Sequence, residues 1–478
     1  MRAKISADKS LEELGNWAQA DPRGLAGYTF QLQEELRRWR DAAAQNSGNS
    51  SRPPSTDGPE QPKPKSLRKP SGLKTGGQPG HPGRTLQFSG TPQHIQVHPL
   101  LECACGEDLS REPALNFQRR QVFDLPVLRL ECTEHRAEIK ECPCCHQTGA
   151  AAFPDEVKAP VQYGKNFRAL LAYLYDAQEG ASLRISEMCA ELFGYDVSEA
   201  TLQSARQEQH LALEPFEKRL VEILPQEPVL HADETSVPIH KVNHWLHVVC
   251  TPLLTFFGIH PSRGKAAIAA LGIIPRCTGW LMHDFLSSYL GFENCLHTFC
   301  KSHLLRELVF LFEEHQQQWA SDLCDLFREM LQYIQDRKAR EAPLTEKDYE
   351  SWRQAYGAIL RKGRQANPLT PEQSANRRAK QSKEQNLLDR LEGYEAGILA
   401  FLWEPNLPFT NNEAERAFRM IKVRLKISGC FRTLEGARRH ARIRSYISTL
   451  RKQGLPVLEY LRLALDGRPF LPQPSNTT

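Results

Sequence analysis

The spacing of apolar residues changes several times along the chain. Near the start they recur every three or four residues, the period of an amphipathic helix, at Leu25, Tyr28, Leu32, Leu36 and Trp39. We therefore predict a helix within residues 1–45, whose stripe could pair weakly with a second copy as a short coiled coil. Residues 46–93 have no such period and are dense in Pro, Gly, Ser and Lys. Such a segment cannot bury enough apolar surface to fold alone, so we predict a disordered basic linker.

Residues 159–224 return to a helical period in three segments, FRALLAYLYDAQ, LRISEMCAELFG and SEATLQSARQEQH. Ser198 stands at the start of the third segment and could cap its helix. Three helices with a Gly-containing turn before the last are typical of a helix-turn-helix, whose third helix could enter the major groove of DNA. Small three-helix units also occur in proteins that bind no DNA, and that alternative stays open.

Strand-like periods follow in VLHADETSV, HWLHVVCTPLLTFFGIH and TGWLMHDF, with a helix-like GKAAIAALG before the last of these. The second of these segments is long enough for two strands, so the order is three strands, a helix and a fourth strand. This order predicts a sheet whose first and fourth strands are neighbours, the ribonuclease-H-like arrangement. We assign residues 225–428 to this domain, with an all-helical insertion at about residues 304–400. The predicted fold class is multidomain α+β, with a mixed sheet and flanking helices, preceded by a zinc ribbon and a small helical domain.

Length and composition place the chain among soluble multidomain proteins. Its 478 residues suggest two to four domains, and 40% apolar and 25% charged residues are ordinary values for a globular protein. No apolar run is long enough to span a membrane, and the first residues lack the apolar region of a secretory signal. We expect a cytoplasmic protein with no membrane partner.

Basic residues are concentrated in two places although the net charge is only +4. Residues 411–452 contain twelve Lys or Arg against three Glu, and residues 52–84 contain seven against two acidic residues. Concentrated basic charge favours a polyanionic partner such as nucleic acid, with a solvated helix face as the alternative. Residues 429–478 are interpreted as a basic C-terminal element.

Six of the thirteen cysteines fall between residues 103 and 145. We predict a zinc-ribbon-like module at residues 94–158, in which two cysteine knuckles, separated by a hairpin, hold one structural Zn²⁺. Four thiolates satisfy the tetrahedral preference of zinc, and the metal supplies folding energy to a small module. The predicted ligands are Cys103, Cys105, Cys142 and Cys145. Cys-x-Cys has one residue fewer between its cysteines than the usual Cys-x-x-Cys knuckle. The residues that could therefore replace a predicted ligand are Cys132, Cys144 and His146. Ordinary reduced cysteines remain the alternative.

Carboxylates in the strand-rich region suggest a second kind of metal site. Asp233 lies in the first predicted strand and Asp284 at the end of the last. Phosphodiester cleavage by divalent ions needs carboxylates that hold the metal, and Mg²⁺ or Mn²⁺ prefers such oxygen ligands. A third carboxylate should come from a later helix, which one of residues 410–412 could cap, with Glu415 in its first turn. Glu415 could instead only stabilise the helix N-terminus.

Cys300 and His303 lie three residues apart after the second aspartate. A single cysteine–histidine pair is too little to complete a tetrahedral metal shell, so we interpret this pair as structural.

Together these motifs resemble a transposase of the insertion-sequence-66 family over nearly the whole chain. NSGNSSRPPSTD and GGQPGHPG are similar to the family's linker, CACGEDL to its zinc-binding segment, and HADET and HDFLSSYL to its catalytic strands. NNEAERAFRMIKVRLKISGCFRT and GARRHARIRSYISTLRKQG resemble its third motif and C-terminal element. Ser236 stands where the family pattern has Gly, and HTFCKSH where HALCNAH is more typical, but no carboxylate is lost.

The resemblance implies a DDE catalytic domain in which Asp233, Asp284 and Glu415 are the catalytic and metal-binding residues. Glu413 is the reserve for the third carboxylate, although residues i and i+2 point to different faces of a helix. The candidate DNA contacts on the helix of Glu415 and its extension are Arg416, Arg419, Lys422, Arg424 and Lys426.

The predicted function is that of a transposase of a bacterial insertion element, which binds double-stranded DNA at the element ends and in the target. It would cleave and transfer DNA strands with bound divalent metal, as a homo-oligomer on DNA, and accessory proteins encoded by the element are further candidate partners. The alternative is a non-catalytic, zinc-containing DNA-binding regulator derived from a transposase. Such a regulator would have no need of three spaced carboxylates. A general nuclease would leave the modules at both ends unexplained.

Overall fold

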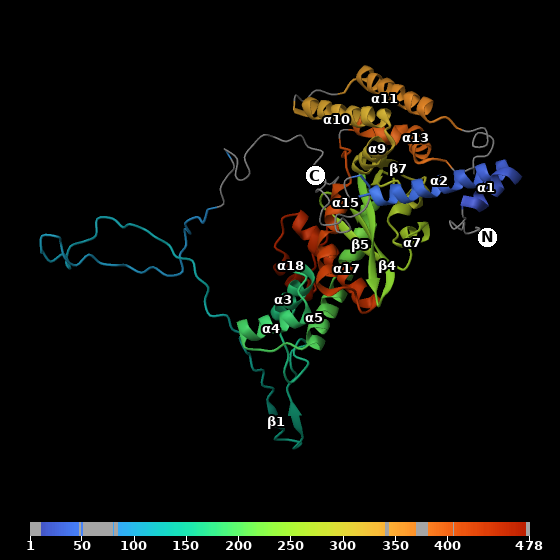
Figure 1. The fold of residues 1–478 in the computed structure, drawn as a ribbon. Helices are drawn as coiled ribbons and strands as arrows, with labels where there is room; N and C mark the ends of the chain where they lie inside the picture. Colours follow the sequence, from blue (N-terminus) through green and yellow to red (C-terminus); the bar gives the residue numbers. More distant parts are fainter. Residues whose placement is uncertain are drawn as a thin grey trace. The chain divides into compact units, whose positions relative to one another are not determined.

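The structure is a computed structural model that describes residues 11–46, 49–50, 80, 85–339, 344–369, 381–404 and 406–474. The predicted linker at residues 46–93 lies largely outside the described residues. The chain divides into two compact units, of which the larger contains residues 1–65, 152–188 and 196–478 and the smaller contains residues 66–151 and 189–195 (Figure 1). Among the described residues, no helix combines the length and the apolar character that a membrane crossing requires.

A five-stranded mixed sheet forms the centre of the larger unit (Figure 1). Its strands are β3 (Val229–Ile239), β4 (Val242–Cys250), β5 (Thr255–His260), β6 (Trp280–His283) and β7 (Leu296–Phe299), in the order β5-β4-β3-β6-β7. The strands β3, β4 and β5 pair antiparallel, whereas β6 is parallel to β3 and β7 is parallel to β6. The prediction that the first and fourth strands are neighbours is confirmed. β7 was not predicted from the sequence.

Helices surround the sheet. Those that precede it are α1 (Leu11–Ala20), α2 (Pro22–Ala44), α3 (Lys165–Ala172), the π-helical η2 (Tyr173–Ala177), α4 (Ser182–Phe193), α5 (Glu199–Ala212), α6 (Glu214–Ile223) and the 3₁₀ turn η3 (Leu224–Gln226). Those between its strands are α7 (Lys265–Ala270), the 3₁₀ turn η4 (Ile274–Arg276) and α8 (Ser287–Leu290). Those between β7 and the third carboxylate are α9 (Lys301–His315), α10 (Gln318–Ala339), α11 (Glu346–Ala366), α13 (Lys383–Gly393) and α14 (Glu395–Trp403). The last are α15 (Asn412–Ala417), α16 (Arg419–Ser428), α17 (Leu434–Lys452) and α18 (Val457–Leu465).

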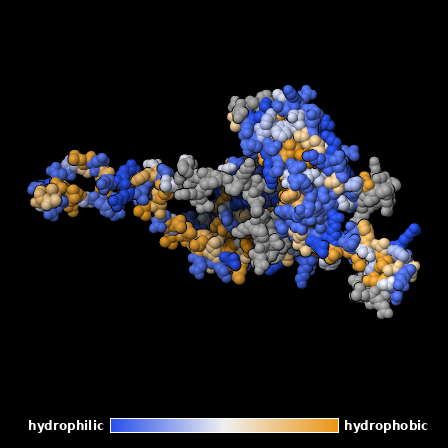
Figure 2. All heavy atoms as spheres, turned by 45° about the horizontal axis from the view of Figure 1, so that its top comes forward, coloured by the Kyte–Doolittle hydropathy of each residue, from blue (hydrophilic) through white to orange (hydrophobic). Residues whose placement is uncertain are grey.

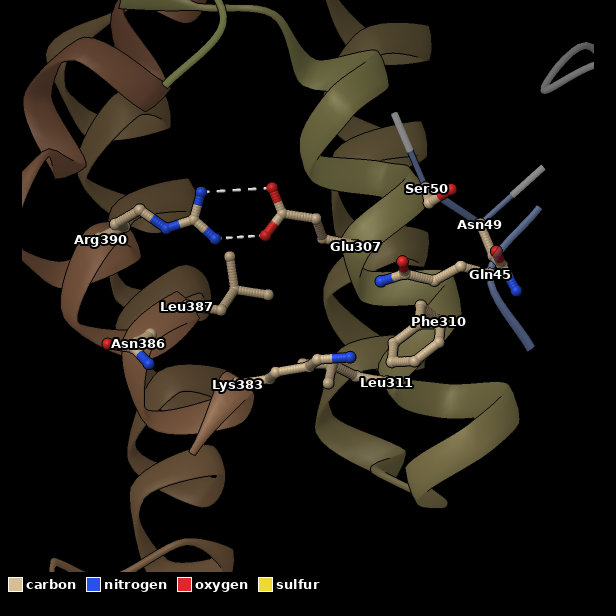
Figure 3. A pocket seen from close by; sticks show the side chains of 10 residues that line it. All are labelled: Gln45, Asn49, Ser50, Glu307, Phe310, Leu311, Lys383, Asn386, Leu387 and Arg390. Carbon is tan, nitrogen blue, oxygen red and sulfur yellow. Dashed lines mark hydrogen bonds and ion pairs between the residues drawn. The ribbon is translucent and has the colours of Figure 1, made fainter. Parts of the chain in front are cut away.

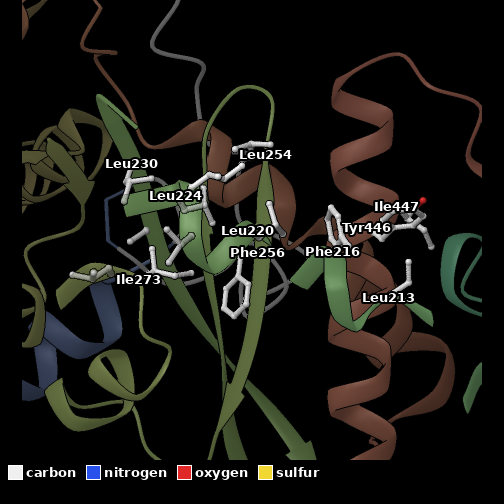
Figure 4. Close-up of a cluster of buried hydrophobic side chains, with 14 of the residues drawn as sticks. Leu213, Phe216, Leu220, Leu224, Leu230, Leu254, Phe256, Ile273, Tyr446 and Ile447 are labelled. Atoms are coloured by element: carbon white, nitrogen blue, oxygen red, sulfur yellow. The ribbon is translucent and has the colours of Figure 1, made fainter. Parts of the chain in front are cut away.

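The two faces of β3 enter different hydrophobic cores, since alternate side chains of a strand point to opposite faces. Leu230 and Ala232 join a core with α6 and α17, in which Phe216 and Tyr446 pack edge to face with centroids 4.8 Å apart (Figure 4). Val237 belongs to a second core, whose helical members include Ala414 of α15, Phe418, and Ile421 of α16. The helices α15 and α16 therefore cover the face of the sheet that carries the odd-numbered residues of β3.

The helices α9–α14 share a third core and pack against the far edge of the sheet. α14 lies so close to β7 that a Cβ atom on Gly397 would be 2.3 Å from the carbonyl oxygen of His297. Figure 2 shows a mostly hydrophilic surface over the helical region that includes α10 and α11.

A pocket of about 630 Å³ lies between α9, α13 and the residues that follow α2 (Figure 3). Glu307 and Arg390 face one another across it, with Nη1 donating to Oε1 at 3.2 Å. None of the residues predicted to be catalytic or metal-binding lines this pocket.

The N-terminal helix α2 meets α9 and α13 through charged side chains. Arg37 lies 2.9 Å from Glu384, and the carboxylate of Asp41 lies 2.9 Å from His315 and 2.8 Å from Lys383. No residue of α2 is fully buried, and Ala44 at its end packs against the core of these helices, so one apolar residue accompanies the charged pairs. The large apolar residues that α2 exposes are Phe30, Leu36 and Trp39.

Of the three helices after residue 164, α3 and α5 belong to the larger unit, whereas α4 is divided, with residues 189–193 in the smaller unit. Ser198 is the N-cap of α5 and accepts a hydrogen bond from the amide of Thr201, as the sequence predicts. α5 lies against α3, α17 and α18. Its buried residues are Leu202, Ala205, Arg206 and Gln209.

The smaller unit has little regular structure. Its antiparallel strands β1 (Ile139–Glu141) and β2 (Thr148–Ala150) flank the second cysteine turn. The hairpin predicted between the two knuckles is wrong, since VFDLPVLRLE at residues 122–131 contains no strand. Its Val122 and Val127 are exposed.

A network of buried charges joins η2, α5 and α17. Arg206 donates to both oxygens of Asp176 at 2.7 Å, and His440 Nδ1 lies 2.7 Å from the same carboxylate. Burial opposes ionisation of Asp176, but Arg206 and His440 hold its pKa well below the usual range. Burial lowers the pKa of His440 to about 3, so this imidazole is neutral. Glu179 extends the network, 3.7 Å from Arg444.

We predict that Asp176→Asn destabilises the larger unit by about 3–5 kcal/mol, because it leaves the Arg206 guanidinium buried without its partner. Glu435→Gln, which breaks the exposed ion pair with Arg438, should change stability by less than about 0.5 kcal/mol. Urea unfolding followed by circular dichroism measures both. Equal effects of the two substitutions would show that the buried pair contributes nothing special.

Candidate active site

The register of the sheet aligns Asp233 with Asp284. Residues 229–231 of β3 pair with residues 280–282 of β6, so that paired residues differ by 51 in number. The same difference separates 233 from 284. Because β3 and β6 are parallel and adjacent, the two aspartates lie side by side where β6 ends. Both side chains are half-buried.

Glu415 lies on a helix that packs on the same face of the sheet. Asp233 shares its face of β3 with Val237, which packs in the core that contains Ala414 and Phe418. Glu415 is in the first turn of α15, between these two residues. His303 lies 4.0 Å from Glu415 and also favours the ionised form of Asp233, so it lies near both carboxylates.

Asn411 attaches the start of α15 to β3. Its side-chain oxygen lies 2.9 Å from His231 Nδ1, and its amide group donates to the carbonyl oxygen of Ala232 at 2.9 Å. Its backbone N–H donates to the Cys300 sulfur at 3.2 Å. Asn411 is the N-cap residue of α15 but makes no capping hydrogen bond with its side chain. The side chain instead joins α15 to β3 beside Asp233, and the backbone N–H joins it to Cys300.

Like charges crowd Asp233. Burial, together with the neighbouring carboxylates of Glu234 and Asp284, raises the pKa of Asp233 to about 7. Glu234 points to the opposite face of β3, where Tyr289 donates to it at 2.6 Å and Arg263 forms an ion pair at 2.7 Å. A cation between Asp233 and Asp284 would relieve their repulsion.

Glu234 was not among the site residues predicted from the sequence. Period-two alternation assigns it to the buried face of β3, but a buried carboxylate with two partners has no sequence signature.

Two histidines support the backbone at Asp284. His283 lies against the backbone oxygen of Asp284, and its Nε2 is 3.0 Å from His297 Nδ1. The other ring nitrogen of His297 lies 3.0 Å from the carbonyl oxygen of Phe292. The Leu286 N–H donates to the Asp284 carboxylate at 3.1 Å, which fixes one of its oxygens. These contacts hold the loop after β6 in one conformation.

The pair that the sequence analysis interpreted as structural meets Glu415. Cys300, His303 and Glu415 place one ligand atom each within 4.8 Å of the others, and in the described ranges they are the one such group of at least three Cys, His, Asp or Glu. Burial opposes ionisation of both Cys300 and His303, yet the pKa of Cys300 is lowered and that of His303 is raised to about 9, because the thiolate and the imidazolium stabilise each other. The sequence could not show that Glu415 joins them.

Glu413, the reserve for the third carboxylate, has different neighbours. It lies 3.7 Å from Lys452 and 3.5 Å from Arg416, and it favours the charged form of His231. Glu415 is therefore the better placed of the two beside His303.

The predicted basic stripe is exposed except at one residue. Arg416, Arg419, Lys422 and Lys426 are exposed on α15 and α16. Arg424 is 5% exposed, lies 3.4 Å from Glu179 and donates to the hydroxyl of Tyr175. Its prediction as a DNA contact is wrong, since Arg424 lies on the side of α16 that faces the buried charge network.

The two cysteine knuckles have similar turns. The Gly106 N–H donates to Cys103 O at 2.8 Å, and the His146 N–H to Cys142 O at 2.9 Å, with Gly106 and His146 both at positive φ. Backbone N–H groups of Cys105, and of Cys145 and Cys144, lower the pKa of the first thiol of each turn. The four predicted ligands do not meet as one group in this structure.

The family model described as "Transposase IS66 family" matches residues 160–439, which include β3, β6, α15 and all three candidate carboxylates. The chain belongs to the IS66 transposase family. A second model, a family of unknown function (DUF6444), matches residues 7–87. A comparison with curated proteins finds no match. Membership in the IS66 family suggests a DNA transposase, and a DDE transposase implies a divalent metal.

Because the pKa of Asp233 is raised, the free energy of unfolding of the metal-free protein should depend on pH. The folded protein holds this proton up to pH about 7, whereas the unfolded chain releases it near pH 4. The folded state then binds more protons in this window, so the free energy of unfolding contributed by Asp233 falls as pH rises from about 4 to 7.

We expect Asp233→Asn to remove this fall, so that the variant gains stability over the wild type as pH rises toward 7. Urea unfolding in chelator at several pH values measures the difference. Asp325→Asn, at an exposed ion pair on α10, is the matched control and should leave the pH dependence unchanged. Parallel curves for wild type and Asp233→Asn would contradict the raised pKa.

Proposed function

We propose that this chain is a DDE transposase that uses Asp233, Asp284 and Glu415 to hold divalent metal, cleaves DNA at the ends of an insertion element and joins them to target DNA. The observation that carries the proposal is the register of β3 and β6, which aligns the two aspartates beneath the helix of Glu415. The strand order, with three antiparallel strands followed by two parallel ones, supports a ribonuclease-H-like core.

The residues fit a hard divalent cation such as Mg²⁺ or Mn²⁺. They offer carboxylate oxygens from β3, from the loop directly after β6 and from α15, and Mg²⁺ is commonly bound by one or two carboxylates together with water and phosphate oxygens. The pKa of Asp233 near 7 indicates repulsion that a bound cation would offset. When bound, the metal ions activate the attacking hydroxyl and stabilise the leaving oxygen of the phosphodiester.

The chain's own groups would position the reacting strand. Asp233 and Asp284 are fixed by the sheet, and Asn411 holds α15 at a set distance from β3. Asp284 is held further by the Leu286 N–H, and His303 balances the negative charge of Glu415 and Asp233. Preorganised groups of this kind need little rearrangement during the reaction.

The exposed basic residues after Glu415 would hold the DNA backbone. Arg416 directly follows the carboxylate, and Arg419 and Lys422 come three and six residues after Arg416, on α15 and the start of α16. Residues three or four apart lie on one side of a helix, so phosphate contacts here would place a DNA strand beside the carboxylates. The basic residues pair with duplex DNA at the element ends and in the target.

We also propose that the knuckles at Cys103, Cys105, Cys142 and Cys145 bind one structural Zn²⁺. Their matched turns support this, since each directs backbone N–H groups at its first sulfur and so favours the thiolate that zinc requires. Zinc would draw the two turns together and fold a unit that has few buried side chains of its own.

Removal of a metal ligand tests the catalytic proposal. We expect Asp233→Asn, Asp284→Asn and Glu415→Gln each to lower the cleavage of element-end DNA by about 10³-fold or more, because several kcal/mol of charge stabilisation is lost. Binding to the same DNA should persist. Glu413→Gln is the matched control, two residues away in the same first turn of α15 but on a different face, and should retain most activity. Strong cleavage by Glu415→Gln with none by Glu413→Gln would reverse the assignment of the third carboxylate.

The salt dependence of DNA binding tests the basic stripe. Replacing Arg419 and Lys422 with Ala should lower the slope of log affinity against log salt by up to about two, since each phosphate contact contributes about 0.9. Affinity for end DNA and for unrelated DNA should fall together. Lys218→Ala, an exposed lysine on α6, is the control. An unchanged slope in the double variant would exclude this helix as the element that holds the backbone.

A further inference from the structure

Cys300, His303 and Glu415 form a cluster whose chemistry differs from that of the two aspartates. Their ligand atoms lie within 4.8 Å of one another and come from two elements, the start of α9 and the first turn of α15. Cys300 is the N-cap residue of α9, and His303 stands three residues later on the same turn. The start of α9 thus supplies the sulfur and the imidazole, and the neighbouring helix supplies the carboxylate.

Polar atoms inside the cluster lack partners. His303 Nδ1 and Glu415 Oε1 are both buried atoms with no hydrogen-bond partner in the part of the chain that the structure describes, and they face each other at 4.0 Å. Buried polar atoms are normally paired, and such exceptions require an explanation. A distance of 4.0 Å is too long for a hydrogen bond but leaves space for an atom bound to both.

The distances suit a tetrahedral transition metal. Zinc bonds of about 2.0–2.3 Å to nitrogen, oxygen and sulfur place the ligand atoms about 3.5 Å apart. The atoms of this cluster would need to close by about 1 Å, which side-chain rotation can supply. The backbone N–H of Asn411 already donates to the Cys300 sulfur, and the N-terminus of α9 favours a thiolate there.

Sulfur and imidazole ligands select the metal. Mg²⁺ prefers oxygen ligands, whereas thiolate and imidazole favour Zn²⁺ and related transition metals. Three protein ligands with a fourth position open to water are an established arrangement for zinc.

From this geometry we infer that Cys300, His303 and Glu415 are a second metal site, selective for Zn²⁺ or a similar transition metal, that shares Glu415 with the proposed Mg²⁺ site. The sharing rests on the proposed function, whereas zinc binding does not. Zn²⁺ bound here would withdraw Glu415 from Mg²⁺, so a high zinc concentration would inhibit the catalysis that Mg²⁺ supports. Zinc and magnesium would then each weaken the binding of the other.

The test counts zinc on the full chain, after removal of metal and dialysis against Zn²⁺. We expect about two zinc ions on the wild type, one in the knuckles and one in this site, and a loss of about one in both His303→Gln and Glu415→Gln. Controls are His244→Gln, on β4, and Cys430→Ser, at an exposed cysteine, which should keep the wild-type count. Cys142→Ser should also lose about one zinc, and the combination with His303→Gln should lose both.

Cobalt provides a second readout. Co²⁺ bound to a thiolate absorbs in the near ultraviolet, so Cys300→Ser in the Cys142→Ser background should remove the remaining absorption. Wild type and His303→Gln with equal zinc counts would overturn the inference, as would a single zinc that Cys142→Ser removes completely. Glu415→Gln alters a partly exposed side chain and tests the site if His303→Gln does not fold.

Asp284→Asn separates this inference from the proposed catalysis. Asp284 is not one of the three ligands, so the variant should keep its zinc while it loses DNA cleavage. Loss of the zinc in this variant would contradict the ligand set. Retained zinc together with full cleavage would refute the catalytic proposal and leave the zinc site standing.

Discussion

The parallel pairing of β3 with β6 is the interaction on which the candidate active site depends. β3 is antiparallel to its other neighbour, β4. The residues of β6 that pair with β3 come 51 positions later in the chain. The register aligns two aspartates that are distant in sequence, and a slip by one residue would turn the side chains of one strand to the other face. Burial of Leu230 and Ala232 in the core with α6 and α17 resists such a slip.

A second constraint fixes the helix that carries Glu415. Ala414 and Phe418 pack on the sheet. The side chain of Asn411 forms a hydrogen bond with β3 and does not cap its own helix. The buried charges around Asp176 then tie α17 to the helices before the sheet. Hydrophobic packing thus sets where α15 lies, and polar contacts set its orientation, because hydrogen bonds are directional and apolar contacts are not.

Much of this arrangement could be predicted from the sequence. The strand periods and their order predicted the neighbouring first and fourth strands, and Ser198 was recognised as a cap because its pattern is local. β7, which lies directly before α9, was missed although it is no shorter than β6. The predicted hairpin of the cysteine module was wrong because an apolar run does not show whether a packing partner exists. Arg424 looked like its exposed neighbours, and only the path of α16 beside Glu179 reveals its burial. The meeting of Cys300 and His303 with Glu415 required the tertiary fold, since these residues are over a hundred positions apart.

The central proposal is that divalent metal binds between Asp233 and Asp284, the two carboxylates that the sheet aligns. Diffraction from crystals soaked in Mn²⁺, with data collected at the manganese absorption edge, locates such a metal directly. The account predicts an anomalous peak within bonding distance of carboxylate oxygens of both Asp233 and Asp284, which disappears in Asp233→Asn. A manganese peak elsewhere on the chain, with none between these two aspartates, would contradict it.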